Sequence, residues 1–284
     1  MKTVHKIAIA RTAYRVVHFA RAMAGLSDKC VAVRDGVTYD LDLSQGIDFA
    51  IYLGNMFEPR TRNALRRLVK PSALVLDIGA NIGAHSLYLA QLVGPSGRVL
   101  CFEPTDFAFA KLTRNMELNP DLAERVTPFH CFLAAKNEAE VPDAIYSSWP
   151  LSQQDGLHAK HLGQAMPTNV VPARSVDGIL EELDNPRVQL VKMDVDGFES
   201  TVLRGCTALL RDNRPIFLME LSPYVLEERG SSVEELLSFF APHGYRFYHE
   251  RTERELPSNA VELERMVDDG SSINVIARAD EKIA

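Results

Sequence analysis

The chain has 284 residues, of which 46% are hydrophobic and 24% are charged, and its formal net charge is −7. This length and composition predict one large domain with at most a small extension. The chain lacks the overall basic character with which nucleic-acid-binding proteins neutralise phosphates, so nucleic acid is not an expected partner.

The cysteines and the apolar runs indicate the compartment. The four cysteines are widely spaced without a CxxC pair, which predicts free thiols, a cytoplasmic protein and no zinc site. No apolar run approaches the roughly 20 residues of a membrane span, so no transmembrane segment is expected.

Residues 1–50 predict an N-terminal extension made of a helix and a β-hairpin. All charged residues before Asp28 are basic, and Asp35-Gly36 is a hairpin signal. The helix carries two apolar stripes, which indicates packing on two sides: against the body, and against an acceptor or a second subunit in a homodimer. A peripheral membrane contact is the alternative. The stripes are Val4, Ile7, Tyr14 and Val17, and Ile9, Val16, Phe19 and Met23.

Residues 51–284 form the predicted catalytic domain, in which strands and helices alternate. This alternation predicts an α/β fold, a mostly parallel sheet with helices on both faces. We expect helices at 57–71, 83–93, 106–118, 198–210 and 232–244, and strands at 73–78, 98–103, 125–133, 187–193, 214–221, 245–251 and 272–279.

A variable insertion at about 138–170 interrupts this alternation. It is long for a loop without structure of its own, so a functional role is expected. Trp149 and Tyr146 are candidates for a sugar-stacking platform or the anchor of a lid. His158 and His161 are candidate catalytic residues that accept a proton from an acceptor hydroxyl, because histidine titrates near neutral pH.

A glycine-rich loop follows the strand at 73–78. Gly79, Asn81 and Gly83 give the pattern G-x-N-x-G at the start of a helix, and Glu103 ends the next strand twenty residues after Gly83. Glycine lets a backbone turn sharply and approach a ligand, and an acid at this distance can accept both hydroxyls of a ribose. The sequence therefore predicts a ribose-bearing ligand.

Three carboxylates follow the strand at 187–193, namely Asp194, Asp196 and Glu199. Ligands of open α/β sheets bind beyond the carboxyl ends of the strands, so Asp194 and Asp196 are candidate site residues. The alternative is structural: Asp196 and Gly197 form a turn, and Glu199 caps the following helix.

Four separated segments, "VLDIGANIGAHSLYLA", "VLCFEPT", "LVKMDVDGFESTVLRG" and "PIFLMEL", resemble the FkbM family of S-adenosylmethionine-dependent methyltransferases in order and spacing. "MFEP" at 56–59 is similar to an acidic "EP" that precedes the first strand in that family. The resemblance implies a class I methyltransferase (Rossmann-like) fold with seven strands, the last antiparallel. It also implies O-methylation of a small molecule, either a sugar or glycan precursor or a secondary metabolite.

The resemblance also implies which residues bind the cofactor. Glu103 would hold the ribose of S-adenosylmethionine, and Asp194 would face the transferred methyl group. The methionine part would lie among Asp77, Gly79, Asn81 and Gly83, and the adenine beside Phe102, Pro104 and Phe132 in the segment 131–133.

Several alternatives remain open from the sequence. A carboxylate among Asp194 and Asp196 is a candidate to hold the ammonium of the cofactor or favour its sulfonium, or to act as general base. The pair is also a candidate for Mg²⁺ binding together with Glu220, because "MDVDGFES" is similar to the "LDGDxYES" of metal-dependent sugar O-methyltransferases. Those enzymes carry a paired aspartate where this chain has only Glu220. A nucleotide-sugar or NAD-binding enzyme and a non-catalytic S-adenosylmethionine-binding protein are the rival functions.

Overall fold

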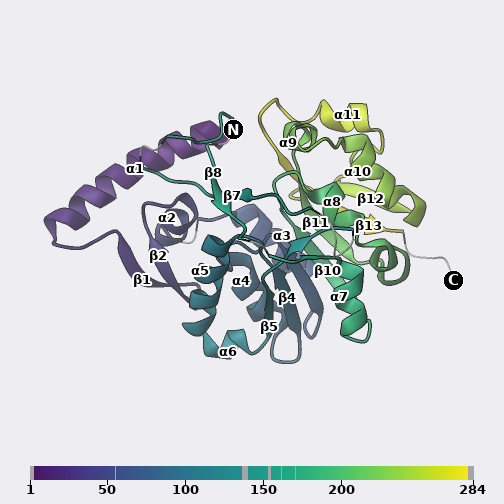
Figure 1. Ribbon diagram of the computed structural model, residues 1–284, viewed down its shortest axis with the longest axis horizontal. Helices are drawn as coiled ribbons and strands as arrows, with labels where there is room; N and C mark the ends of the chain where they lie inside the picture. Colours follow the sequence, from purple (N-terminus) through teal and green to yellow (C-terminus); the bar gives the residue numbers. More distant parts are fainter. Residues whose placement is uncertain are drawn as a thin grey trace.

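A seven-stranded sheet forms the centre of the computed structural model, which describes residues 3–54, 56–135, 140–152, 155–160, 162–169 and 171–280. The strand order is β12-β13-β11-β10-β3-β4-β5 (Figure 1). In this sheet β13 runs opposite to the other six strands, which share one direction. This confirms the predicted α/β sheet. The strands are β3 (Leu74–Ile78), β4 (Arg98–Phe102), β5 (Val126–Phe129), β10 (Val188–Met193), β11 (Ile216–Leu221), β12 (Tyr245–His249) and β13 (Ile273–Ala279).

Helices cover both faces of the sheet because successive side chains of its strands point to opposite sides. Val75 of β3 packs in one apolar cluster, and its neighbours Leu76 and Ile78 pack in another. On the Val75 face lie α3 (Pro59–Leu68), α4 (Ala84–Val93) and α5 (Asp106–Glu117). On the opposite face lie α7 (Val176–Glu182), α8 (Glu199–Leu203), α10 (Val233–Phe240) and α11 (Ala260–Glu264). Further helical segments are α6 (Pro120–Ala123), α9 (Pro223–Glu228), the π-helical turn Leu209–Asn213 and the 3₁₀ turn Ala241–His243.

The N-terminal residues form the predicted helix and hairpin, which are joined to the core by hydrogen bonds. Asp35 and Gly36 have φ values of 48° and 77°, as a tight hairpin turn requires. The backbone of the second hairpin strand donates to two buried amides, with Asp40 N 2.9 Å from Asn115 Oδ1 in α5 and Thr38 N 2.8 Å from Asn119 Oδ1 just after it. The elements are α1 (Thr3–Met23), β1 (Lys29–Arg34), β2 (Val37–Asp42) and the unpredicted α2 (Gly46–Tyr52).

The insertion at 138–170 is more regular than its sequence indicates. Its strands β7 (Ala144–Ser148) and β8 (Gln164–Pro167) pair antiparallel. The predicted strand at 125–133 is also wrong in its extent, because β5 ends at Phe129. After this break, β6 (Phe132–Leu133) pairs with β9 (Ala173–Arg174) outside the main sheet.

The loop after β3 and the end of β10 lie in close contact. Asp194 N donates to Ile78 O at 3.0 Å, which brings the backbone of Asp194 against Gly79. A Cβ atom added to Gly79 would lie 1.8 Å from Asp194 O, and φ of Gly79 is +79°. Both the space and the conformation therefore require glycine at this position.

The turn after β10 buries Glu199, the first residue of α8. Asp196 and Gly197 have positive φ values of 49° and 91°, so they form the turn that was the structural alternative. Glu199 is 3% exposed, and its Oε1 accepts from Val195 N at 3.4 Å. Burial, and then the nearby charge of Asp194, raise the pKa of Glu199 to about 7.

Gly79→Ala is expected to lower the free energy of unfolding by about 2 kcal/mol or more, because the added Cβ meets a backbone oxygen in a conformation unfavourable to alanine. The matched control is Gly230→Ala, where φ is +73° and nothing lies within 4 Å of the added Cβ. The control should lower the free energy of unfolding by about 1 kcal/mol, because only the backbone conformation is unfavourable to alanine there. Urea denaturation of both variants measures the difference, and equal losses would contradict the close contact.

The free energy of unfolding of Glu199→Gln is expected to increase, relative to that of wild type, as pH rises. The folded chain binds the Glu199 proton more tightly than the unfolded chain, with a pKa of about 7 against 4.5. Its stabilising contribution is therefore complete below pH 4.5 and is lost as pH rises through 7. Glutamine does not titrate, so the stability difference should shift by about 2 kcal/mol between pH 5 and pH 8. Denaturation at both pH values, with the exposed Glu262→Gln as control, checks this, and a constant difference would contradict it.

Candidate active site

A cleft with about 530 Å³ of empty space, part of it open to solvent, lies beyond the carboxyl ends of β3, β4 and β10. This is where an open α/β sheet binds its ligands. Residues from the glycine-rich loop, the ends of three strands, β6, β7 and the turn after β10 form its walls. They are Ile78, Gly79, Asn81, Phe102, Glu103, Pro104, Cys131, Phe132, Leu133, Ile145, Tyr146, Ser147, Asp194, Val195, Asp196, Phe198 and Val202.

Glu103 is fixed at the end of β4 by three hydrogen bonds. Its Oε2 accepts from Asn81 N at 2.9 Å, and its Oε1 accepts from Thr105 N at 2.9 Å and Thr105 Oγ1 at 2.6 Å. Burial raises the pKa of Glu103, although these hydrogen bonds act in the opposite direction. The glycine-rich loop thus orients the carboxylate that was expected to bind the ribose.

Asn81 forms the middle of the loop in a left-handed conformation, with φ of 48°. Its side chain accepts from Ile82 N at 2.9 Å and donates to Ser147 O at 3.1 Å. Asparagine tolerates this conformation better than most residues with a side chain. The loop is therefore connected to β7 across the cleft.

The apolar end of the cleft contains the residues expected beside the adenine. Phe102, Pro104 and the segment 131–133 all line it. Phe132 packs edge-on against Phe198, with ring centroids 5.3 Å apart. These side chains offer a flat apolar slot of the kind that receives an aromatic ring.

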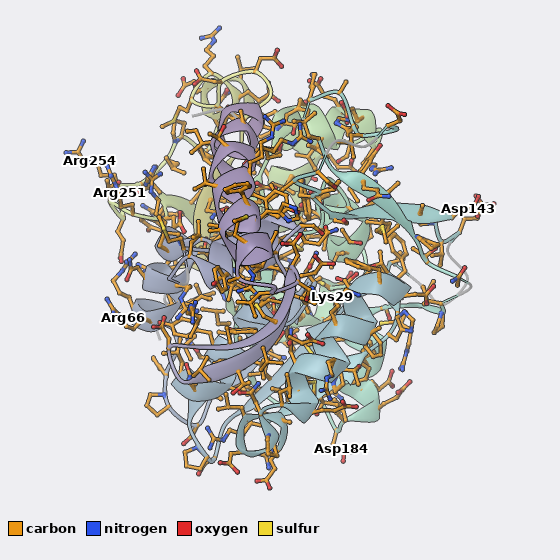
Figure 2. All side chains as sticks on the ribbon, turned by 90° about the vertical axis from the view of Figure 1, so that its left-hand side faces the viewer. Lys29, Arg66, Asp143, Asp184, Arg251 and Arg254 are labelled. Atoms are coloured by element: carbon orange, nitrogen blue, oxygen red, sulfur yellow. The ribbon has the colours of Figure 1, made fainter. Side chains whose placement is uncertain are left out.

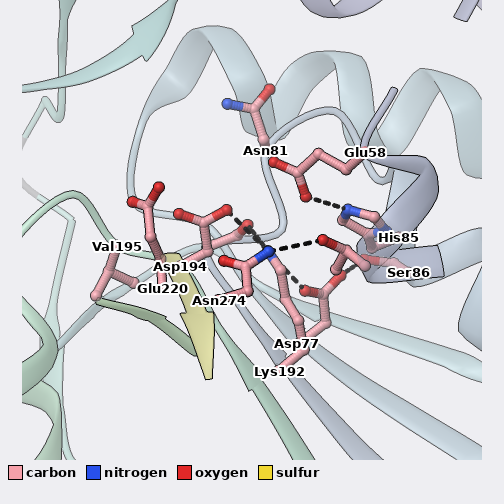
Figure 3. Close-up of polar contacts among 12 residues, drawn as sticks. Glu58, Asp77, Asn81, His85, Ser86, Lys192, Asp194, Val195, Glu220 and Asn274 are labelled. Atoms are coloured by element: carbon pink, nitrogen blue, oxygen red, sulfur yellow. Dashed lines mark hydrogen bonds and ion pairs between the residues drawn. The ribbon is translucent and has the colours of Figure 1, made fainter. Parts of the chain in front are cut away.

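Lys192 lies at the base of the site, although the sequence analysis assigned it no role. Its Nζ donates to Gly79 O at 3.1 Å and lies 3.4 Å from Asp77 Oδ1 and 3.7 Å from Asp194 Oδ2 (Figure 3). Burial alone would lower the pKa of Lys192, but Asp77 and Asp194 raise it above its ordinary value. One buried ammonium therefore links the loop after β3 to the end of β10.

Two of the residues expected beside the methionine part lie behind the loop, outside the lining of the cleft. Asp77 is fully buried, and its Oδ2 accepts from Ser86 Oγ at 2.6 Å. Gly83 has φ of +82°, and a Cβ there would meet the side chain of Leu112 at 2.5 Å. Neither is among the residues that line the cleft. They shape the loop from below, whereas Gly79 and Asn81 face the cleft.

Glu58 and His85 form an ion pair beside the cleft that the sequence analysis did not assign. Glu58 Oε2 lies 2.9 Å from His85 Nε2, and the Glu58 side chain points toward the side where Asp194 lies (Figure 3). Burial would raise the pKa of Glu58, but the hydrogen bond and charge of His85 lower it to about 2. The "MFEP" segment was the sequence signal that could have identified it.

The pKa values of Asp194, Asp196 and Glu220 are raised, whereas that of Glu58 is lowered. Burial is the main cause that raises the pKa of all three, and their mutual repulsion adds to it for Asp196 and Glu220. Glu220 is hydrogen-bonded by Ser272. Within the described ranges no three His, Cys, Asp or Glu side chains are grouped to hold a metal ion, so the Mg²⁺ site expected from these acids finds no support.

The insertion supplies one wall of the cleft, through Ile145, Tyr146 and Ser147. The Arg229 guanidinium lies 6.0 Å from the Tyr146 ring centroid and 4.4 Å from that of Phe198. His158 does not line the cleft, because it pairs with Glu228 at 3.1 Å. The other histidine of the prediction, His161, lies outside the described residues.

Of the two residues predicted as a sugar-stacking platform or the anchor of a lid, Tyr146 lines the cleft and Trp149 does not. Trp149 instead connects two segments through its backbone, since its carbonyl accepts from Gly46 N at 2.8 Å. This bond holds the end of β7 against the start of α2.

Three curated relatives resemble the chain at similar levels. 2-O-methyltransferase NoeI of Sinorhizobium fredii is 28% identical over 55% of this chain and 66% of its own length. Hexuronic acid methyltransferase AglP of Haloferax volcanii is 29% identical over 48% and 50%, and Methyltransferase 1 of Beauveria bassiana is 29% identical over 47% and 58%. The chain therefore spans about half to two thirds of the length of these relatives.

A solved structure and a family model carry the same family name. The FkbM methyltransferase of Methylobacillus flagellatus KT aligns with a TM-score of 0.43 at 15% identity, over 82% of this chain and 54% of that one. The family model, described as the methyltransferase FkbM domain, matches residues 77–247, which is more than half of the chain. The protein whose sheet, glycine-rich loop and acidic cleft are described above thus belongs to the FkbM methyltransferase domain family.

Proposed function

We propose that the chain transfers a methyl group from S-adenosylmethionine to a hydroxyl group of a sugar-like small molecule. The observation that carries this proposal is the placement of Glu103. Its carboxylate is fixed by the glycine-rich loop at the end of β4 and lines the same cleft as Asp194 and the apolar slot. A ribose, an adenine and a reactive group can therefore be held in one cleft.

The residues of the cleft fit this cofactor. Glu103 Oε2 accepts one hydrogen bond, so a lone pair remains for a ribose hydroxyl. Phe102, Pro104 and Phe132 provide apolar surface for the adenine. Gly79, Asn81 and Asp194 line the part of the cleft in which the methionine part would lie.

Asp194 is the residue best placed to act as general base. Bound S-adenosylmethionine supplies an activated methyl sulfonium, so the protein needs mainly to align the acceptor and to remove its proton. Asp194 lines the cleft with 31% of its side chain exposed, and burial raises its pKa, which makes its carboxylate a better proton acceptor. Lys192 holds it in position from below.

Glu58 has a different role because its pKa is low. A carboxylate with a pKa of about 2 stays ionised and binds protons weakly, so it suits the binding of a cation better than base catalysis. We assign it to the positively charged ammonium of the methionine part. His85 keeps it ionised and oriented.

The acceptor class is inferred from the relatives and from the site. Two relatives are named as methyltransferases that act at a 2-O position and on hexuronic acid. Tyr146 and Phe198, with Arg229 beside them, provide the aromatic and hydrogen-bonding surface that sugars require. A hydroxyl of a sugar or glycan precursor is therefore the proposed acceptor, with a secondary metabolite as the alternative.

Calorimetric titration tests the cofactor. Wild-type protein should bind S-adenosylmethionine and not NAD, and Glu103→Ala should weaken the binding about tenfold or more, because hydrogen bonds to a charged group are lost. Glu117→Ala, an exposed glutamate on α5, is the control that should bind like wild type. Folded wild-type protein that binds NAD instead would contradict the proposal.

Asp194→Asn separates turnover from binding. The variant should keep its affinity for S-adenosylmethionine within a few-fold, but its methyl transfer to a glycan acceptor should fall about 10²-fold or more, because the general base is lost. The measurement is release of S-adenosylhomocysteine. Unchanged turnover would show that Asp194 is not the base.

Glu58→Gln should weaken the binding of S-adenosylmethionine and of S-adenosylhomocysteine equally, by about tenfold, because both ligands carry the methionine ammonium. Only S-adenosylmethionine carries the sulfonium. If Glu58→Gln lowered the affinity for this ligand alone, Glu58 would be placed at the sulfonium instead. Glu253→Gln removes a surface ion-paired glutamate and serves as control. Unchanged affinity for both ligands, with an intact thermal transition, would contradict the assignment.

A further inference from the structure

The outward face of α1 is apolar, although the helix lies at the surface of the molecule. Ile7 and Tyr14 of the first predicted stripe face the body and are each 8% exposed. The second stripe faces solvent, with exposed fractions of 62% for Ile9, 67% for Val16, 68% for Phe19 and 75% for Met23. In Figure 2 α1 runs along the side that faces the viewer, with no other element of the ribbon in front of it.

Exposed large apolar side chains are concentrated around this helix. Leu26, Val31 and Val33 follow the stripe, at 54%, 57% and 61% exposure. Seven such side chains therefore lie between residues 9 and 33. In all the rest of the described chain there are five, namely Leu53, Met56, Leu183, Val261 and Met266. Exposed apolar side chains concentrated in one stretch of the chain indicate a binding surface.

Charge is distributed just as unevenly. Residues 1–27 contain five basic and no acidic residues, which leaves 26 basic residues against all 38 acidic residues in the rest of the chain. Asp28, the first acid, is paired with His18 at 2.8 Å and accepts from Tyr14 at 2.7 Å. A strongly acidic protein thus presents one basic, amphipathic helix.

One arginine of α1 lies beside the apolar stripe. Arg15 is exposed and lies one helical turn from Phe19. Arg11 donates to Pro150 O at 3.3 Å and Arg21 donates to Ser27 O at 2.8 Å, so these two are held against other segments of the chain. Their charges still act on a surface beside α1, because screening becomes substantial only beyond about 10 Å at 0.1 M salt.

We propose that α1 binds the surface of an anionic lipid bilayer, with Ile9, Val16, Phe19 and Met23 entering the boundary between headgroups and acyl chains. A basic helix with an apolar face binds such a surface through both its apolar area and its charge. A second subunit and a membrane surface were both expected from the sequence as occupants of this face, and the basic charge of α1 favours the membrane surface. A second copy would place one basic α1 against another, whereas anionic lipid has the opposite charge.

This binding requires no membrane-crossing segment. Among the described residues no helix is both long and apolar enough to span a bilayer. An interfacial helix lies in the plane of the surface instead. The inference does not depend on the proposed methyl transfer.

Vesicle flotation of the full chain tests the proposal. The protein should float with vesicles of phosphatidylcholine containing about a third phosphatidylglycerol. It should bind pure phosphatidylcholine at least about tenfold more weakly, and 0.5 M salt should weaken the anionic binding, because the attraction is screened. Val16→Asp/Phe19→Asp should reduce binding to anionic vesicles about tenfold or more, while the control Val261→Asp/Met266→Asp, also at exposed apolar positions, should leave it unchanged.

Two results would overturn the proposal. One is a failure of the wild-type chain to float with anionic vesicles, or flotation that both double variants retain. The other is a stable dimer in light scattering without lipid that Val16→Asp/Phe19→Asp dissociates and the control does not, since this would assign the face to a second copy. Arg15→Glu distinguishes the charge contribution, because it should weaken binding to anionic vesicles only.

Discussion

The buried ammonium of Lys192 is the interaction on which the site depends. It is surrounded by the Gly79 carbonyl and the carboxylates of Asp77 and Asp194, and the residue is 4% exposed. Burial of a charge is costly unless it is paired and hydrogen-bonded, and loss of one partner of such a group typically costs about 3–5 kcal/mol. Lys192 therefore fixes the ends of β3 and β10 relative to each other.

The same arrangement divides the acids of the site into two classes. Glu58 is paired with His85, which holds its pKa near 2, whereas burial raises the pKa of Asp194. Different environments thus give neighbouring carboxylates different roles, one as a permanent negative charge and one as a proton acceptor. The positive charge of Lys192 acts on both carboxylates and lowers the pKa of each, against the effect of burial.

Residues before the family match, which begins at residue 77, contact segments beside the cleft. Glu58, the residue that precedes α3, pairs with His85 of α4. Arg11 of α1 donates to Pro150 O, and Gly46 N to Trp149 O, beside the strand β7 that carries Tyr146. A surface that binds α1 would therefore lie close to the segment that carries Tyr146 into the wall of the cleft (Figure 1).

The sequence by itself determined the features that depend on near neighbours in the chain. Alternating strands and helices predicted the sheet, Asp35-Gly36 predicted the hairpin, and the pattern of Gly79, Asn81 and Glu103 predicted one ligand cleft. It failed where distant segments meet. The strand predicted at 125–133 breaks because its last residues pair with β9, which lies about forty residues later.

Only the tertiary structure decided the charges of the site. Lys192 is 113 positions from Gly79, and His85 is 27 positions from Glu58, so no local pattern shows that these pairs touch. Strand order places them together, and the low dielectric of the interior then sets their pKa values. Periodicity and glycine positions are local properties of a chain, whereas the electrostatics of a site depend on which distant groups share one buried volume.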